Sequence, residues 1–131
     1  AAQEDDEALY NLGVVYDDGL GVAADYVQAA AYYRQAAALG NTDAMVNLGL
    51  LYQEGYGVEQ DWQQAAELFR QAAEQGDDAA QFNLGLSYAQ GEGVPQDYDE
   101  AAKWWKRAAK QDNKDAQAAL EELAKIRAEE G

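Results

Sequence analysis

The sequence has 131 residues, of which 48% are hydrophobic, so it is long enough for one domain with a buried core. It contains neither Cys nor His, which excludes disulfides, thiolate metal sites and the commonest general base of enzymes. Its 25 acidic and 9 basic residues give a net charge of −16, which repels nucleic acid and anionic membrane surfaces and favours basic partners.

Side chains that could support catalysis are scarce. Ser87 is the single serine and Thr42 the single threonine, so carboxylates, Lys and Tyr would have to do the chemistry. Nothing singles out an acid and base pair among the 25 acids, and we expect no enzyme and no cofactor. No apolar run is long enough to span a bilayer, so we expect no membrane insertion, and the compartment stays open.

The chain repeats with a period of 36 residues. The segment "ALYNLGVVYDDGLGVAADY" from Ala8 returns as "AMVNLGLLYQEGYGVEQDW" from Ala44 and as "AQFNLGLSYAQGEGVPQDY" from Ala80. Thirteen of the 36 positions are identical in all three copies. We therefore expect one domain over 1–131 that consists of three repeats, 8–43, 44–79 and 80–115, and a partial fourth copy over 116–131.

The first part of each copy has the apolar spacing of a helix. In the first copy Ala8, Leu12 and Tyr16 recur every four residues, which predicts one buried stripe, and the other copies keep the pattern. A glycine inside each of these helices predicts close approach of a second helix; these glycines are Gly13, Gly49 and Gly85.

A glycine-rich loop follows each first helix. In the first copy "GLGVAA" fits the Gly-x-Gly-x-x-Ala pattern of dinucleotide loops, but the counterparts "GYGVEQ" and "GEGVPQ" do not. A helix precedes each loop, whereas a dinucleotide loop follows a strand. The glycines are therefore predicted to make a turn between two helices.

A second helix is predicted in each copy over 25–39, 61–75 and 97–111. Asp25, Asp61 and Asp97 each stand three residues before Gln or Glu, the spacing of a capping box. Gly40 and Gly76 are placed to end two of these helices in the left-handed conformation. Paired alanines and aromatic residues, among them Tyr32-Tyr33 and Trp104-Trp105, predict a packed core between the helices.

The fourth copy departs from this pattern. The segment "LEELAKIRAEE" presents Leu120, Leu123 and Ile126 on one side and charge elsewhere, which predicts a capping helix. Because a single helical hairpin cannot bury its apolar face, the copies must stack. The predicted fold is an all-α solenoid of stacked antiparallel helix pairs with this helix at its C-terminal end.

The recurring pattern A-x-x-N-L-G-x-x-Y-x-x-G-x-G-V-x-x-D-[YW]-x-x-A-A resembles the Sel-1-like repeat, a relative of the tetratricopeptide repeat, over residues 8–115. The cysteines of that family's disulfide-rich branch are absent. The resemblance implies a right-handed solenoid without catalytic activity. It also implies an adaptor that holds proteins or peptides on the concave surface of its first helices.

If the first helices line the concave surface, residues beside the buried stripe point toward a partner. Asparagine can pair with the backbone of an extended peptide, and its apolar neighbours would form pockets. The alternative role of the asparagines is to bridge helix to helix. The candidate binding residues are Asn11, Asn47, Asn83, Tyr10, Val46, Phe82, Val14, Leu50 and Leu86.

Acids surround these positions, so the predicted partner is a basic or basic-hydrophobic segment. Lysines and arginines that could clamp a C-terminal carboxylate are missing from the first helices. Asp17, Asp18 and Asp25 could suggest a calcium site, but the spacing is not that of an EF-hand and the other copies lose the acids, so we expect no metal.

Two alternatives stay open. Copies without insertions would also suit an engineered or idealised scaffold that has no natural ligand, although the loop positions vary between copies. The acids concentrate in residues 1–79, which hold 15 acids and only Arg34 and Arg70 as bases. We expect a monomer, with weak head-to-tail association as the alternative.

Overall fold

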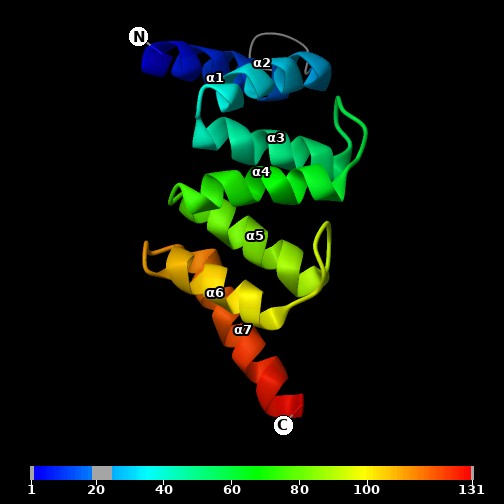
Figure 1. Cartoon of the computed structure of the whole chain (residues 1–131), viewed down its shortest axis with the longest axis vertical. Coiled ribbons are helices and arrows are strands. Elements are labelled where there is room, and N and C mark those ends of the chain that lie inside the picture. The colour runs from blue at the N-terminus through cyan, green and yellow to red at the C-terminus, as the bar shows by residue number, and fades with distance from the viewer. Residues whose placement is uncertain (1, 19–24, 131) are drawn as a thin grey trace.

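The computed structural model describes residues 2–18 and 25–130, with side chains for residues 5–17 and 25–129. These residues form helices and no strand, and the helices make antiparallel pairs stacked along one long axis (Figure 1). The prediction of an all-α solenoid is thereby confirmed. The helices are α1 (Ala2–Asp18), α2 (Tyr26–Ala38), α3 (Thr42–Glu54), α4 (Trp62–Glu74), α5 (Asp78–Gln90), α6 (Tyr98–Ala109) and α7 (Lys114–Glu130).

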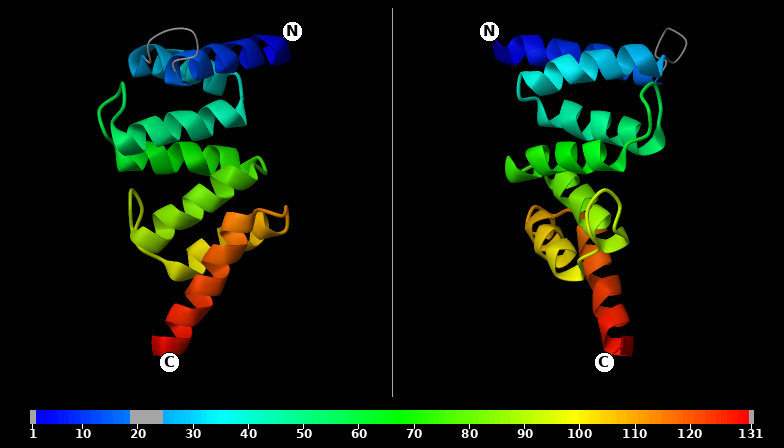
Figure 2. Two further views of the ribbon diagram at one scale, coloured as in Figure 1. Left: turned by 180° about the vertical axis from the view of Figure 1, so that it is seen from behind. Right: turned by 45° about the vertical axis from the view of Figure 1, so that its right-hand side comes forward.

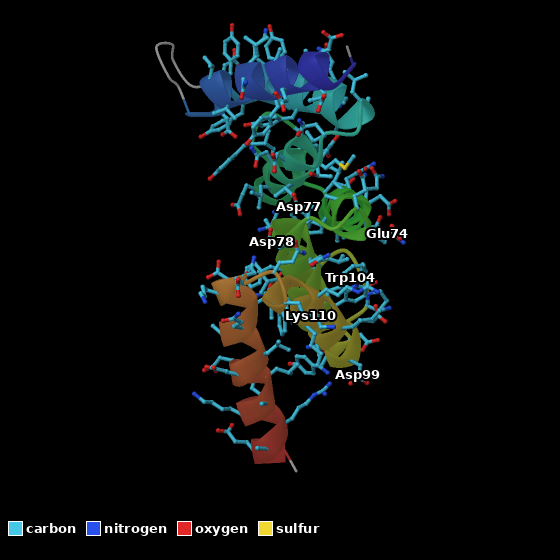
Figure 3. All side chains as sticks on the ribbon, turned by 90° about the vertical axis from the view of Figure 1, so that its left-hand side faces the viewer. Glu74, Asp77, Asp78, Asp99, Trp104 and Lys110 are labelled. Atoms are coloured by element: carbon cyan, nitrogen blue, oxygen red, sulfur yellow. The ribbon has the colours of Figure 1, made fainter. Side chains whose placement is uncertain are left out.

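Each helix packs mainly on its neighbours in the chain. The pairs α1–α2, α3–α4 and α5–α6 form the repeats, and α2–α3, α4–α5 and α6–α7 form the joints between them (Figure 2). In Figure 3, α4 and α6 lie on one side of the stack and α3 and α7 on the other. The core is correspondingly a series of three apolar clusters along the stack.

The second helix of each repeat begins where the sequence predicts. Asp25, Asp61 and Asp97 are in extended conformation and accept backbone N–H groups of the first turn, at 3.0 to 3.1 Å. The helices end one or two residues earlier than predicted, at Ala38, Glu74 and Ala109. Gly40 and Gly76 adopt positive φ, and Asp112 does the same at their equivalent position with φ 65°.

The glycines inside the first helices mark contact with an aromatic side chain. A Cβ on Gly13, Gly49 or Gly85 would come within 2.3 to 2.6 Å of the ring of Tyr33, Phe69 or Trp105. All three rings are buried. The predicted close approach of the two helices is confirmed, and large aromatic rings fill the space that the glycines leave.

The second glycine of each described loop has a role that the sequence did not predict. Gly57 has φ 72°, and a Cβ there would lie 2.3 Å from the carbonyl oxygen of Tyr26 in the preceding repeat. Gly93 lies in the same way against the carbonyl of Trp62. These loops therefore join repeats as well as turning the chain. The first-copy loop, 19–24, lies outside the described residues.

The predicted buried stripe of the first copy is wrong at two positions. Ala8 is exposed and Leu12 is 41% exposed, whereas their equivalents Ala44 and Leu48 are buried. The later residues share a core cluster with α2, the second helix of the preceding repeat. Within the described chain no such helix precedes α1, which leaves this face uncovered.

Asparagine joins repeats at two of the three joints. Asn41 caps α3 by accepting from Ala44 N at 2.8 Å and donates its Nδ2 to Asp6 of the preceding repeat, also at 2.8 Å. Asn113 does the same for α7, donating to Asp78 at 2.9 Å.

The joint between α4 and α5 differs. Its equivalent residue, Asp77, accepts from Ala80 N at 2.9 Å and so caps α5, but a carboxylate has no N–H to donate. Burial raises the pKa of the nearby Asp43 carboxyl, and the charge of Asp77 raises it further.

Candidate functional site

Three cavities lie along the face formed by the first helices. Each is lined by neighbouring first helices of the stack and contains at least one predicted binding residue. We name them after one residue each: the Asp43 pocket, the Tyr56 pocket and the Ile126 pocket.

The Asp43 pocket, of about 300 Å³, lies where α1 and α3 meet near the N-terminal end of α3. Acids dominate its lining, and none of the described bases contributes to it. It is lined by Asp6, Glu7, Tyr10, Asn11, Asn41 and Asp43.

The Tyr56 pocket, of about 210 Å³, lies at the other end of the same two helices. It combines two carboxylates, two tyrosines, two leucines and an asparagine: Asp17, Glu54, Tyr26, Tyr56, Leu50, Leu51 and Asn47. The rings of Tyr26 and Tyr56 stack with their centroids 4.9 Å apart.

A buried phenol fixes the inner wall of this pocket. Tyr33 donates its hydroxyl proton to Asp17 Oδ2 at 2.9 Å and accepts Nδ2 of Asn47 at 3.3 Å. Burial, followed by the hydrogen bond to Asp17, raises the pKa of Tyr33, so the phenol keeps its proton beyond the pH at which an ordinary tyrosine ionises. The orientation of Asp17 thus depends on helix α2, and α3 is tied to the same phenol.

The Ile126 pocket, of about 340 Å³, lies between α5, α6 and α7 and is mostly apolar. Trp105 donates its Nε1 to the carbonyl oxygen of Phe82 at 3.1 Å, so its polar group is satisfied. The walls are Leu86, Ala89, Gln90, Tyr98, Trp105, Ala119, Glu122, Leu123 and Ile126.

The structure brings five of the nine predicted binding residues to these cavities. Tyr10 and Asn11 line the Asp43 pocket, Asn47 and Leu50 the Tyr56 pocket, and Leu86 the Ile126 pocket. Leu50 is 38% exposed, as a contact residue should be. The tyrosines of the Tyr56 pocket were missed, although Tyr56 stands at a loop position that varies between copies.

Three of the remaining predicted residues contribute chiefly to packing. Val46 is 7% exposed and belongs to a core cluster, so its predicted orientation toward a partner is wrong. It was assigned by its spacing alone, and the helix turns this position inward against the next repeat. Val14 and Phe82 are half-buried and pack against the clusters of their own repeats.

The asparagine positions differ from one another. Asn11 is exposed, and the side chain of Asn47 donates to Tyr33. Asn83 is half-buried, and its backbone carbonyl accepts from Ser87 Oγ at 3.2 Å. The Asn47 side chain bridges α3 to α2, which is the alternative role that the sequence left open. That the three asparagines together pair with the backbone of a bound peptide stays a prediction.

Larger hollows lie elsewhere. Two cavities of about 550 and 540 Å³ lie beside the loops before α4 and α6. Exposed polar residues such as Glu59, Gln60 and Gln64 supply much of the lining of the first.

Among the described residues, no group of three or more acids is arranged to hold a metal ion. In that same part of the chain, none of the helices has the length and apolar character to cross a membrane.

Comparison with known proteins identifies the repeat. The family model described as "Sel1 repeat" matches residues 6–41, 42–77 and 78–113. These bounds keep the 36-residue period and begin two residues before those expected from the sequence. A search of curated proteins gave no match.

Solved structures show the same fold. A protective antigen of uropathogenic Escherichia coli strains that displays an SLR fold is 44% identical at a TM-score of 0.82, over 85% of this chain and 24% of the antigen. A Sel1 repeat protein from Oxalobacter formigenes is 35% identical at a TM-score of 0.84, over 90% of this chain and 49% of that protein. The present chain thus spans about a quarter and about half of these two.

A third structure is more distant in sequence. The cysteine rich protein B of Helicobacter pylori is 20% identical at a TM-score of 0.72, over 92% of this chain and 97% of that chain. At that identity the likeness concerns the fold alone.

Proposed function

Because the chain belongs to the Sel1 repeat family, whose members are generally non-catalytic protein-interaction scaffolds, we propose that it binds a segment of a partner protein along the face of α1, α3, α5 and α7. One observation carries this choice of face: it has cavities at both ends of the described stack, and these contain Leu50 and Leu86, which hold the same position in successive repeats.

The charge of the chain supports a basic or basic-hydrophobic partner. A net charge of −16 attracts cationic segments over a distance, and the partly exposed Leu50 and Leu86 supply short-range contact. Of the lysines and arginines whose side chains the structure describes, none lines any of the three cavities. An acidic segment would therefore meet repulsion along this face.

A peptide selection tests the proposal. A display library of random 20-residue peptides is selected on the native protein, and enriched peptides are then measured on a Leu50→Ala/Leu86→Ala variant. Asn47 is left intact because it bonds to Tyr33. The control is Val27→Ala, which removes an aliphatic side chain that is 65% exposed on α2, a second helix.

We expect the double variant to bind enriched peptides about tenfold more weakly, which corresponds to about 1.4 kcal/mol, and the control to bind them normally. Equal binding by the double variant would show that the partner face is elsewhere. Failure to enrich any peptide would contradict the scaffold proposal and agree with an idealised scaffold that has no ligand.

A further inference from the structure

The face of the first helices changes its chemistry from one end of the stack to the other. Two positions of the repeat line the Tyr56 pocket through Asp17 and Glu54. One repeat later the same positions hold Gln53 and Gln90, and one repeat later again they hold Ala89 and Ile126, which line the Ile126 pocket. Paired carboxylates thus give way to amides and then to aliphatic side chains.

The Tyr56 pocket and the Ile126 pocket lie at equivalent places in the repeat. Tyr26 corresponds to Tyr98, Leu51 to Leu123 and Asn47 to Ala119, each 72 residues later. The backbone differs in one respect, because α3 ends at Glu54 and Tyr56 follows in a loop, whereas α7 continues through the equivalent positions. The ligand preferences of the two pockets should therefore differ through their side chains and through the absence of a counterpart of Tyr56 in the Ile126 pocket.

The Tyr56 pocket suits a cationic side chain. Asp17 is held by the buried Tyr33, while the exposed Glu54 faces solvent, so two negative charges border the cavity. Tyr56 is 47% exposed and offers a ring face beside them. Arginine stacks on aromatic rings and pairs with carboxylates, and the stem of lysine or arginine can lie against Leu50.

The Ile126 pocket suits an apolar side chain. Ile126 is 37% exposed at its rim, whereas Trp105 and Leu123 are buried at 4% and 5% exposure. Glu122 contributes the one charged group among the described residues of the lining, and the Nε1 of Trp105 is already bonded. A leucine or phenylalanine side chain would bury apolar surface here without leaving a polar group unpaired.

We propose that this face selects a partner segment with a lysine or arginine that enters the Tyr56 pocket and an apolar residue that enters the Ile126 pocket. The pockets are two repeats apart, so the segment is extended; it passes Gln53 on the way to the Ile126 pocket, of which Gln90 is already a wall. This inference rests on the proposed function and adds the identity and order of the anchors.

The test uses one peptide from the selection described above and two variants of the protein. Asp17→Asn/Glu54→Gln removes both charges while the asparagine can still accept from Tyr33. Ile126→Glu places a charge at the rim of the apolar pocket, where the native side chain is already partly exposed. The peptide is synthesised in native form, with its basic residue replaced by glutamine, and with its apolar anchor replaced by serine.

The expected result is a crossed pattern in fluorescence polarisation. Compared with the native protein, Asp17→Asn/Glu54→Gln should bind the native peptide about five- to tenfold more weakly. It should bind the glutamine peptide as tightly as the native protein does. Ile126→Glu should weaken binding of the native peptide by a similar factor and leave binding of the serine peptide unchanged.

Three results would overturn the inference. If selected peptides bound this face without a basic residue, the cationic anchor would be contradicted, and the proposed function would still hold. If Asp17→Asn/Glu54→Gln weakened binding of the glutamine peptide as much as binding of the native peptide, the two charges would not contact the basic residue. The absence of any selected peptide would contradict both the inference and the proposed function.

Discussion

Replacing Gly57 by alanine should destabilise the protein more than the same change at another glycine of positive φ. A non-glycine residue at φ 72° costs about 1–2 kcal/mol. The new Cβ would also lie 2.3 Å from both the carbonyl carbon and the oxygen of Tyr26. Because both are backbone atoms, the loop must shift, and overpacking of this kind costs about 1–3 kcal/mol more. The expected total is about 2–5 kcal/mol.

The matched control is Gly76→Ala. Gly76 has φ 96°, but a Cβ added there would meet no atom within 4 Å, so only the conformational cost of about 1–2 kcal/mol applies. Both substitutions restrict the unfolded chain equally, and that effect cancels in the comparison. Urea denaturation followed by far-ultraviolet circular dichroism measures both free energies of unfolding. Equal losses in the two variants would refute the claim that Gly57 joins two repeats by close backbone contact.

Three further predictions concern polar groups. Asn41→Asp keeps the cap of α3 but loses the bond to Asp6, so urea denaturation should show a loss of about 1–2 kcal/mol; no loss would mean that this bond is not stabilising. Because the pKa of Tyr33 is raised in the folded state, its proton is retained there and lost from the unfolded chain above pH 10. Above pH 10 the unfolding free energy of the native protein should therefore fall with rising pH more steeply than that of Tyr33→Phe, by up to about 1.4 kcal/mol per pH unit. Equal slopes in the two proteins would contradict this. Finally, moderate salt should raise the melting temperature because it screens the acids of residues 1–79, whereas an unchanged Tm would show that these acids interact too weakly to matter.

Much of the fold could be predicted because the repeat supplies three independent copies of each signal. The caps at Asp25, Asp61 and Asp97 depend on local spacing, and so do the glycines that face Tyr33, Phe69 and Trp105. Leu12 could not be assigned correctly in the same way, because its exposure depends on whether another helix lies before α1.

The candidate site was less predictable, because the averaged pattern hides differences between copies. The predicted asparagines are alike in sequence, but Asn47 meets Tyr33, where Asn83 has Phe69 at the corresponding position. Phenylalanine has no hydroxyl to bond, so the environment changes although the asparagine does not. Positions that vary, such as Asp17 and its counterpart Ala89, define the chemistry of the pockets, and a consensus omits them.

The asparagine joints have a consequence for the length of the protein. Excision of residues 42–77 would place Asn41 directly before Asp78, where Asn41 could cap the helix now capped by Asp77 and still donate to Asp6. The Asn113–Asp78 joint would be untouched, and both Asp43 and its neighbour Asp77 would be deleted. The matching joints thus allow the chain to lengthen or shorten in steps of 36 residues with this cap and this hydrogen bond between repeats retained, while α2 would pack on α5 in place of α3.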